Sequence, residues 1–187
     1  MEILNFKTLI IINDYTWVEM ASYGGFEKVC FEGSSHLSEY QIQESHIECL
    51  LQVIIMITEA WFRKAERHVN ICEIYFEMKD YPFIVNSCFL AMYSVIKALF
   101  VLKNIECKTL EGLIYLLKIY YVDEGLFDRG LFKFFCKVNE LNSEFLQINW
   151  DIFDEKIALE VFNNTNVFVD YSKDLFDELS KCENCNF

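Results

Sequence analysis

A histidine and two arginines stand close together in the segment RKAERH, residues 63–68. Cleavage of a phosphodiester without metal needs a cation that holds the phosphate and an imidazole that moves a proton. On one helix, however, residues five positions apart lie about 140° apart, so Arg63 and His68 would not share a face. His68 also falls on an apolar seam, where we interpret it as a core or interface residue. His68, Arg67 and Arg63 remain the catalytic candidates of an alternative, enzymatic hypothesis.

A second set of polar residues follows one edge of the apolar segment NSCFLAMYSVIKALF, residues 86–100. At 100° per residue, Asn86, Tyr93 and Lys97 fall within about 40° of one another, and Ser87 and Ser94 lie beside them. The other side is apolar, which predicts a helix packed over about two-thirds of its circumference. We expect the polar edge to face water, a ligand or a partner.

Two of the eight cysteines, Cys182 and Cys185, form a CENC segment near the C-terminus. A structural zinc site needs four ligands, and the other six cysteines stand singly, without a second pair. Cys182 and Cys185 are therefore the candidate ligands, but we expect no metal and no cofactor. In a chain of this size that stays in the cytoplasm, we expect reduced thiols.

The formal net charge is −13, and the Lys and Arg residues form no basic stripe. Because nucleic-acid affinity depends mainly on cations that meet phosphates, we expect no direct binding of RNA or DNA. A protein partner with a basic surface fits this charge.

Neither a membrane span nor a signal peptide is expected. The longest apolar run, residues 89–102, contains Lys97, and a spanning helix needs about 20 apolar residues. The N-terminal segment MEILNFKTLIIIND has no small-residue cleavage site. These features predict a cytoplasmic protein.

The elements that position these residues are mostly helices. Only six Gly and one Pro interrupt the 187 residues. A seam at alternating steps of four and three predicts one long helix, or two nearly collinear ones, before the break at Asp80-Tyr81-Pro82. Its members are Ile47, Leu51, Ile54, Thr58, Trp61, Ala65, His68, Cys72 and Tyr75.

Further helices are predicted to about Lys103, from about Thr109, over LFDRGLFKFFCKVNEL, and from Asp154 to about Lys181. The last one repeats the seam spacing at Val161, Thr165, Phe168, Ser172, Leu175 and Leu179. Residues 1–36 instead show short β-branched and aromatic runs between turn signals. The predicted fold class is mainly α: an up-and-down bundle of four or five helices over 37–181, a β-hairpin or three-stranded β appendage at 1–36, and a tail at 182–187.

The blocks DYPFIVNSCFLAMYSVIKALF, KTLEGLIYLL, VDEGLF and ALEVFNNTNVFVDYSKDLF occur in this order between about Thr58 and Leu179. In order and spacing they resemble the HEPN superfamily, and especially its small toxin-like members. The resemblance implies an up-and-down helical bundle that often forms a homodimer. Many HEPN proteins are metal-independent endoribonucleases in toxin–antitoxin, CRISPR and phage-defence systems, whereas others are non-catalytic and bind nucleotides or proteins.

This chain departs from the family where the chemistry would lie. Relatives carry an Arg and a pair of Tyr where this chain has Ser87, Phe89 and Leu90, and a His where it has Leu110. The family ribonuclease motif, Arg followed by His after four to six residues, belongs just before or at the start of the last helix. The corresponding stretch, VNELNSEFLQINWDIF, contains neither Arg nor His.

The resemblance and the departures together favour a non-catalytic, acidic, HEPN-like protein that acts by protein–protein interaction in a defence, toxin–antitoxin or phage counter-defence system. It would inhibit a partner that normally binds nucleic acid. Two alternatives stay open. One is a divergent endoribonuclease built around His68 and Arg67, and the other is a nucleotide-binding module that uses the polar edge.

Overall fold

The computed structural model describes the backbone of residues 9–12, 15–22, 25–32 and 39–183, and the side chains of residues 52–180. The chain separates into two compact units, Met1–Val53 with Glu106–Lys108, and Ile54–Ile105 with Thr109–Phe187. The larger unit holds the helical bundle. Each unit is described by itself below.

Three strands lie in the smaller unit: β1 (Leu9–Ile12), β2 (Tyr15–Ser22) and β3 (Gly25–Glu32). They pair antiparallel in the order β1-β2-β3, with Leu9 opposite Val18 and Tyr15 opposite Glu32. The packing of side chains on this sheet lies outside the described residues. A separate β appendage over residues 1–36 therefore stays a prediction.

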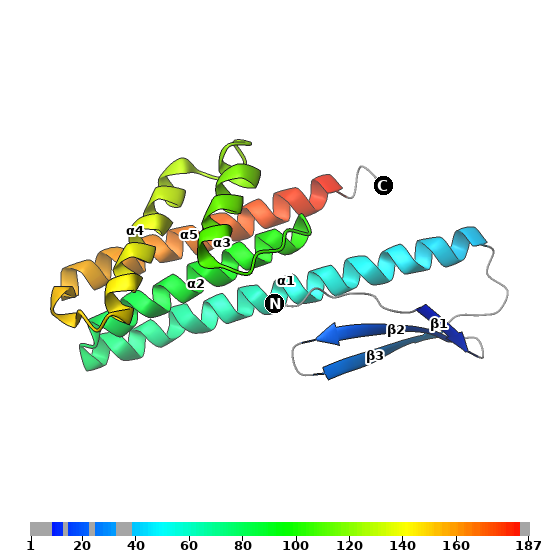
Figure 1. The fold of residues 1–187 in the computed structure, drawn as a ribbon, viewed down its shortest axis with the longest axis horizontal. Helices are drawn as coiled ribbons and strands as arrows, with labels where there is room; N and C mark the ends of the chain where they lie inside the picture. Colours follow the sequence, from blue (N-terminus) through cyan, green and yellow to red (C-terminus); the bar gives the residue numbers. More distant parts are fainter. Residues whose placement is uncertain (1–8, 13–14, 23–24, 33–38, 184–187) are drawn as a thin grey trace. The chain divides into compact units, whose positions relative to one another are not determined.

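Five α-helices make up most of the described chain, which confirms the mainly α class (Figure 1). A π-helical turn (Lys118–Val122) follows α3, and a short 3-10 helix (Trp150–Ile152) precedes α5. The helices are α1 (Glu39–Met78), α2 (Tyr81–Leu102), α3 (Leu110–Leu117), α4 (Arg129–Leu146) and α5 (Glu155–Glu183).

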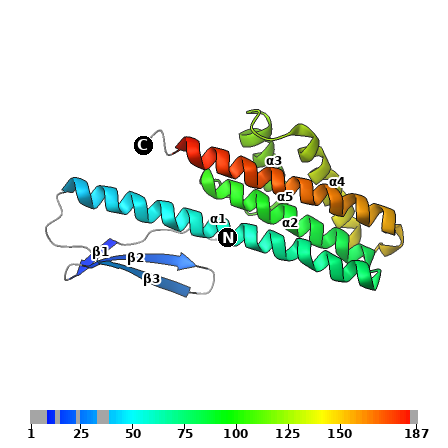
Figure 2. The same ribbon diagram turned by 180° about the vertical axis from the view of Figure 1, so that it is seen from behind.

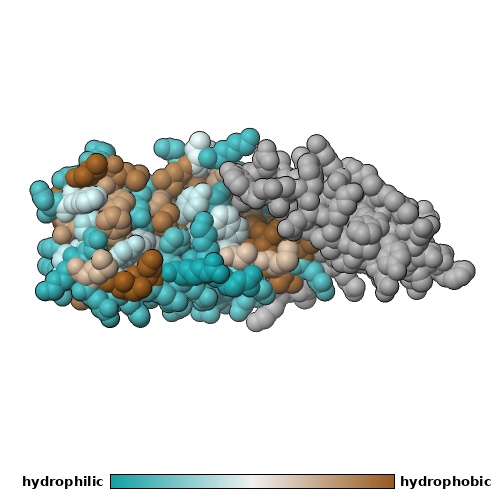
Figure 3. Space-filling model, turned by 90° about the horizontal axis from the view of Figure 1, so that it is seen from below, coloured by the Kyte–Doolittle hydropathy of each residue, from teal (hydrophilic) through white to brown (hydrophobic). Residues whose placement is uncertain are grey.

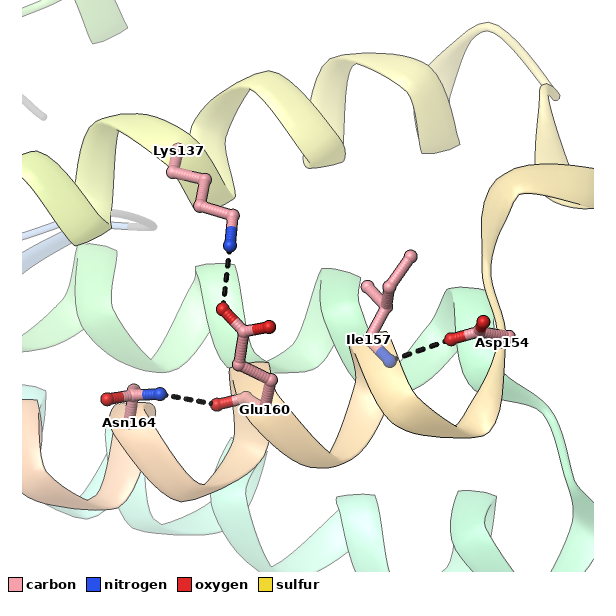
Figure 4. A network of polar contacts seen from close by, with 5 residues as sticks. All are labelled: Lys137, Asp154, Ile157, Glu160 and Asn164. Carbon is pink, nitrogen blue, oxygen red and sulfur yellow. Dashed lines mark hydrogen bonds and ion pairs between the residues drawn. The ribbon is translucent and has the colours of Figure 1, made fainter.

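Polar side chains cap the N-termini of three of these helices. Thr109 Oγ1 accepts a hydrogen bond from Gly112 N at 3.1 Å, and Asp128 Oδ1 accepts one from Leu131 N at 2.8 Å. Asp154 Oδ1 likewise accepts from Ile157 N at 2.8 Å, which places the start of α5 within one residue of its predicted position (Figure 4). Each cap satisfies a backbone N–H that has no partner inside its helix.

The four long helices run up and down, as predicted. Tyr75 of α1 contacts Phe83 of α2, with ring centroids 5.6 Å apart, and Phe62 and Phe76 of α1 contact Phe176 and Phe162 of α5. These pairs make α1 antiparallel to both α2 and α5. Helix α4 is antiparallel to α2 and α5 in turn, and α3 with its π-helical turn lies in the connection between α2 and α4 (Figures 1 and 2).

The predicted seams are confirmed within the described side chains. In α5, five seam residues are buried and Leu179 is half-buried. In α1, the seam alternates between fully buried small residues (Thr58, Ala65 and Cys72) and half-buried larger ones (Ile54, Trp61, His68 and Tyr75). The hydroxyls of the buried Thr and Ser residues are satisfied within their own helices. Thr58, Ser94, Thr165 and Ser172 each donate to the carbonyl four residues earlier.

Helix α2 is the central helix of the bundle. Within the described residues it is the one helix long and apolar enough to cross a membrane by length and composition. Yet 78% of its most apolar window is buried inside the fold. Its apolar composition is thus accounted for by packing against α1, α4 and α5.

Candidate functional site

The polar edge of α2 lies mostly inside the bundle. Ser87, Ser94 and Lys97 are buried, and Asn86 and Tyr93 are half-buried. The expectation that this edge faces water is therefore wrong for its three buried members. Helix α4 packs against α2 at the beginning of this edge.

Helix α4 provides a polar partner for the beginning of this edge. Asn86 Nδ2 donates a hydrogen bond of 2.8 Å to Oδ1 of Asn142, which is only 4% exposed. One turn earlier, Oδ1 of Asn139 is buried and accepts no hydrogen bond from the described residues. The pair Asn86–Asn142 thus fixes the register of α2 against α4, and no local pattern in the sequence marks Asn142, because its partner lies 56 residues away.

Asn142→Ala should lower the free energy of unfolding by about 1–3 kcal/mol, because it leaves the Asn86 amide without its acceptor in a partly buried place. Urea unfolding measures this. Asn164→Ala is the control, since Asn164 Nδ2 donates to the Glu160 carbonyl of its own helix and does not link two helices there, and we expect a loss below about 0.5 kcal/mol. Equal losses in the two variants would contradict the register role.

The far end of the edge places a buried ammonium beside an aromatic ring. Lys97 is 3% exposed, and its Nζ lies 5.7 Å from the centroid of the Tyr93 ring. A ring face attracts a cation at this distance, and the attraction is larger when the cation is shielded from water. Lys97 is therefore part of the packed interior, and it is not exposed as a phosphate-binding lysine would be.

The second predicted group, on α1, does not converge. His68 is half-buried, and burial followed by the nearby Lys64 ammonium lowers its pKa below the usual value. Arg63 Nη1 instead bonds Glu59 Oε2 at 3.1 Å, one turn away, and its side chain is exposed, as is Arg67. Arg63 is thus paired with a carboxylate, and five positions on the helix separate it from His68 by about 140°, so the two side chains do not share a face.

Two thiols form a buried pair between α1 and α2. The Sγ atoms of Cys72 and Cys88 lie 3.8 Å apart, and both residues are fully buried. The hydrogen bond with Cys72, followed by burial, raises the pKa of the Cys88 thiol well above its ordinary value. Both thiols therefore act as small core residues.

For metal binding, no group of three or more His, Cys, Asp or Glu occurs among the residues with described side chains. The side chain of Cys182 and the whole of Cys185 lie outside the described part. Helix α5 continues to Glu183, so residues 182–183 are helical and not part of a tail.

The surface of the bundle is acidic and carries few bridging cations. Lys137 of α4 bonds Glu160 of α5 at 2.7 Å, and this ammonium lowers the pKa of the Glu160 carboxyl (Figure 4). Lys173 of α5 bonds Glu66 of α1, also at 2.7 Å. Seen from below, the described surface is largely hydrophilic and is interrupted by separate hydrophobic patches (Figure 3).

The loop between α4 and α5 has an unusual backbone. Ile148 N donates to Phe145 O and Asn149 N donates to Glu144 O, which is the hydrogen-bond pattern of a left-handed helix end. The left-handed residue, Ile148, has φ of 62°. Three other helical segments end with the same pattern, and they place Lys79, Asn104 and Gly125 there.

Of these four residues, Ile148 alone is β-branched. The left-handed conformation costs an ordinary L-residue about 1–2 kcal/mol, and a branched Cβ makes the crowding worse. Ile148 gains no packing in return, since it is 73% exposed.

Comparison with known proteins gives one family. The model of the HEPN domain matches residues 58–175, which covers α1 from Thr58, all of α2, α3 and α4, and α5 up to Leu175. No curated protein matches the chain. The matched range coincides with the up-and-down bundle in which the groups described above lie.

Proposed function

Because this chain belongs to the HEPN domain family, we propose that it is a non-catalytic member that acts in the cytoplasm by binding a protein with a basic surface. The setting is a defence, toxin–antitoxin or phage counter-defence system, in which the chain inhibits a partner that normally holds nucleic acid. Its net charge of −13 suits such a partner and repels nucleic acid itself.

One observation carries this proposal. The segment before α5, where the family places its Arg and His, contains neither residue. The chain has three Arg and three His in all. Those with described side chains, Arg63, Arg67, His68 and Arg129, lie on α1 and at the start of α4, and Arg63 is paired with a carboxylate.

The two alternatives would each need a different set of residues to be accessible. A divergent endoribonuclease would need His68 to reach a scissile phosphate together with a cation, yet His68 is half-buried on α1 and Arg63 is paired with Glu59. A nucleotide-binding module would need Asn86, Ser87, Tyr93, Ser94 and Lys97 to be reached from outside, yet three of them are buried. Formation of a homodimer stays a proposal by family analogy.

We expect the purified chain to leave RNA intact in buffer with a metal chelator, and His68→Ala and Arg67→Ala to behave like the natural sequence. Gel analysis of a mixed-sequence RNA measures this, and a heat-denatured sample of each protein serves as the control for contaminating nuclease. RNA cleavage that persists without metal and disappears in His68→Ala would establish the enzymatic alternative. A rise in melting temperature on addition of nucleotides would favour the nucleotide-binding module.

A further inference from the structure

One end of the bundle exposes large apolar side chains from three segments. Met78 ends α1, Leu146 ends α4, and Ile148, Trp150 and Ile152 lie between α4 and α5. These five residues are called the end surface below. They are exposed by 66%, 68%, 73%, 43% and 38%, respectively.

An aromatic cluster beneath the end surface holds these segments together. The ring of Phe83, in the first turn of α2, lies 5.2 Å from Phe145, 5.8 Å from Trp150 and 5.6 Å from Tyr75, measured between centroids. Phe145 and Trp150 are also stacked, at 6.1 Å. The α1–α2 turn and the α4–α5 loop accordingly lie at the same end of the bundle (Figures 1 and 2).

The hydrogen bonds of the loop keep the end surface in place. Trp150 Nε1 donates to Phe145 O at 3.2 Å, and Asn149 Nδ2 donates to Glu144 Oε2 at 2.7 Å. These bonds connect the loop to the last turn of α4, and the Ile148 side chain is exposed to solvent. An exposed, preorganised apolar group in a disfavoured backbone conformation is a feature that fold stability alone does not explain.

The two segments that carry this apolar group are rich in carboxylates. Residues 77–80 and 144–156 contain six of them, against two cations, Lys79 and Lys156. The carboxylates are Glu77, Asp80, Glu144, Asp151, Asp154 and Glu155. Two copies of the chain meeting at this surface would bring like charges together, and nucleic acid or an anionic lipid surface would be repelled in the same way.

We propose that the end surface docks a cationic amphipathic segment of a partner protein. Apolar side chains of the segment would cover Leu146, Ile148 and Trp150, and its Lys or Arg residues would meet the carboxylates of residues 77–80 and 144–156. This inference rests on the proposed function and adds to it the place of binding and the chemistry of the partner. Ile148, the most exposed of the five residues, provides the main apolar contact.

The test uses the full chain and a synthetic amphipathic helix of Leu and Lys as the probe, with affinity measured by calorimetry. Ile148→Asn should weaken binding about tenfold, as loss of a central interface residue does. The same substitution should raise the melting temperature, because Asn tolerates the left-handed conformation. Weaker binding by a more stable protein cannot be attributed to misfolding.

Val167→Asn is the matched control. Val167 is 57% exposed on α5, so the same change in chemistry is made away from the end surface, and affinity should not change. A peptide of Leu and Glu with the same apolar face should bind at least tenfold more weakly than the Lys peptide, and binding of the Lys peptide should weaken as salt is raised.

Unchanged affinity in Ile148→Asn would overturn the proposal, and so would equal binding of the Glu and Lys peptides. A dimer in sedimentation that dissociates in Ile148→Asn would identify a second copy as the occupant instead. Binding to phosphatidylserine vesicles that is lost in Ile148→Asn would identify a membrane. Metal-free RNA cleavage would refute the non-catalytic function without bearing on the end surface, so the two failures are distinguishable.

Discussion

Phe168→Ala is expected to lower the free energy of unfolding by about 3–5 kcal/mol, the range for a buried Phe replaced by Ala. Phe168 is fully buried on α5. Its ring lies 5.3 Å from that of Phe127 and 6.1 Å from that of Phe135, measured between centroids. Phe135 in turn stacks on Phe89 of α2. The truncation therefore opens a cavity where α2, α4 and α5 meet.

Urea unfolding followed by circular dichroism measures this loss. The neighbouring residue provides the control, because Val167 points to solvent and Val167→Ala should change stability by less than about 0.5 kcal/mol. Two equal, small losses would mean that the helices do not enclose Phe168 as described. A loss of helical signal without denaturant would mean that the substitution costs more than the whole stability of the bundle.

The stability of the bundle should fall steeply in alkaline solution because of Cys88. Its pKa is raised in the folded state, by the hydrogen bond with Cys72 and then by burial. Above the pKa of an unfolded thiol, about 8.5, the unfolded chain loses this proton while the folded chain retains it. The unfolded state then binds fewer protons, so stability decreases as pH rises, by about 1.4 kcal/mol per pH unit for this one group.

Cys88→Ala tests this by how the free energy of unfolding varies with pH, and not by its value at any one pH. The truncation lowers stability at every pH, but between about pH 8.5 and the raised folded pKa the plot of unfolding free energy against pH should be flatter than for the natural sequence. Val85→Ala, which truncates a buried residue that has no titrating group, should leave the slope unchanged. An unchanged slope in Cys88→Ala would show that the thiol is not kept neutral by its surroundings.

The helical class and the core positions could be predicted from sequence because burial imposes a period on the chain. The seam through Thr58, Ala65 and Cys72, and the one through Val161, Thr165 and Phe168, identify the buried faces of α1 and α5 by their spacing alone. The starts of α3 and α5 were similarly readable, since Thr109 and Asp154 are local caps. The extent of the HEPN match also follows the blocks recognised along the chain.

The candidate site was predictable only in part. The spacing of Asn86, Tyr93 and Lys97 identifies a polar edge, but its contact with Asn142 depends on how α4 crosses α2. The same holds for the end surface, where Phe83 of α2 fixes Trp150 of a loop 67 residues later.

The sequence by itself determined the helices, their buried faces and the absence of Arg and His before the last helix, because these are properties of one segment at a time. Only the tertiary structure decided that the polar edge is covered, that Arg63 and His68 do not converge, and that Met78 and Ile148 expose apolar groups at one end of the bundle. Each of these depends on pairs of helices distant in sequence, whose packing no local period specifies.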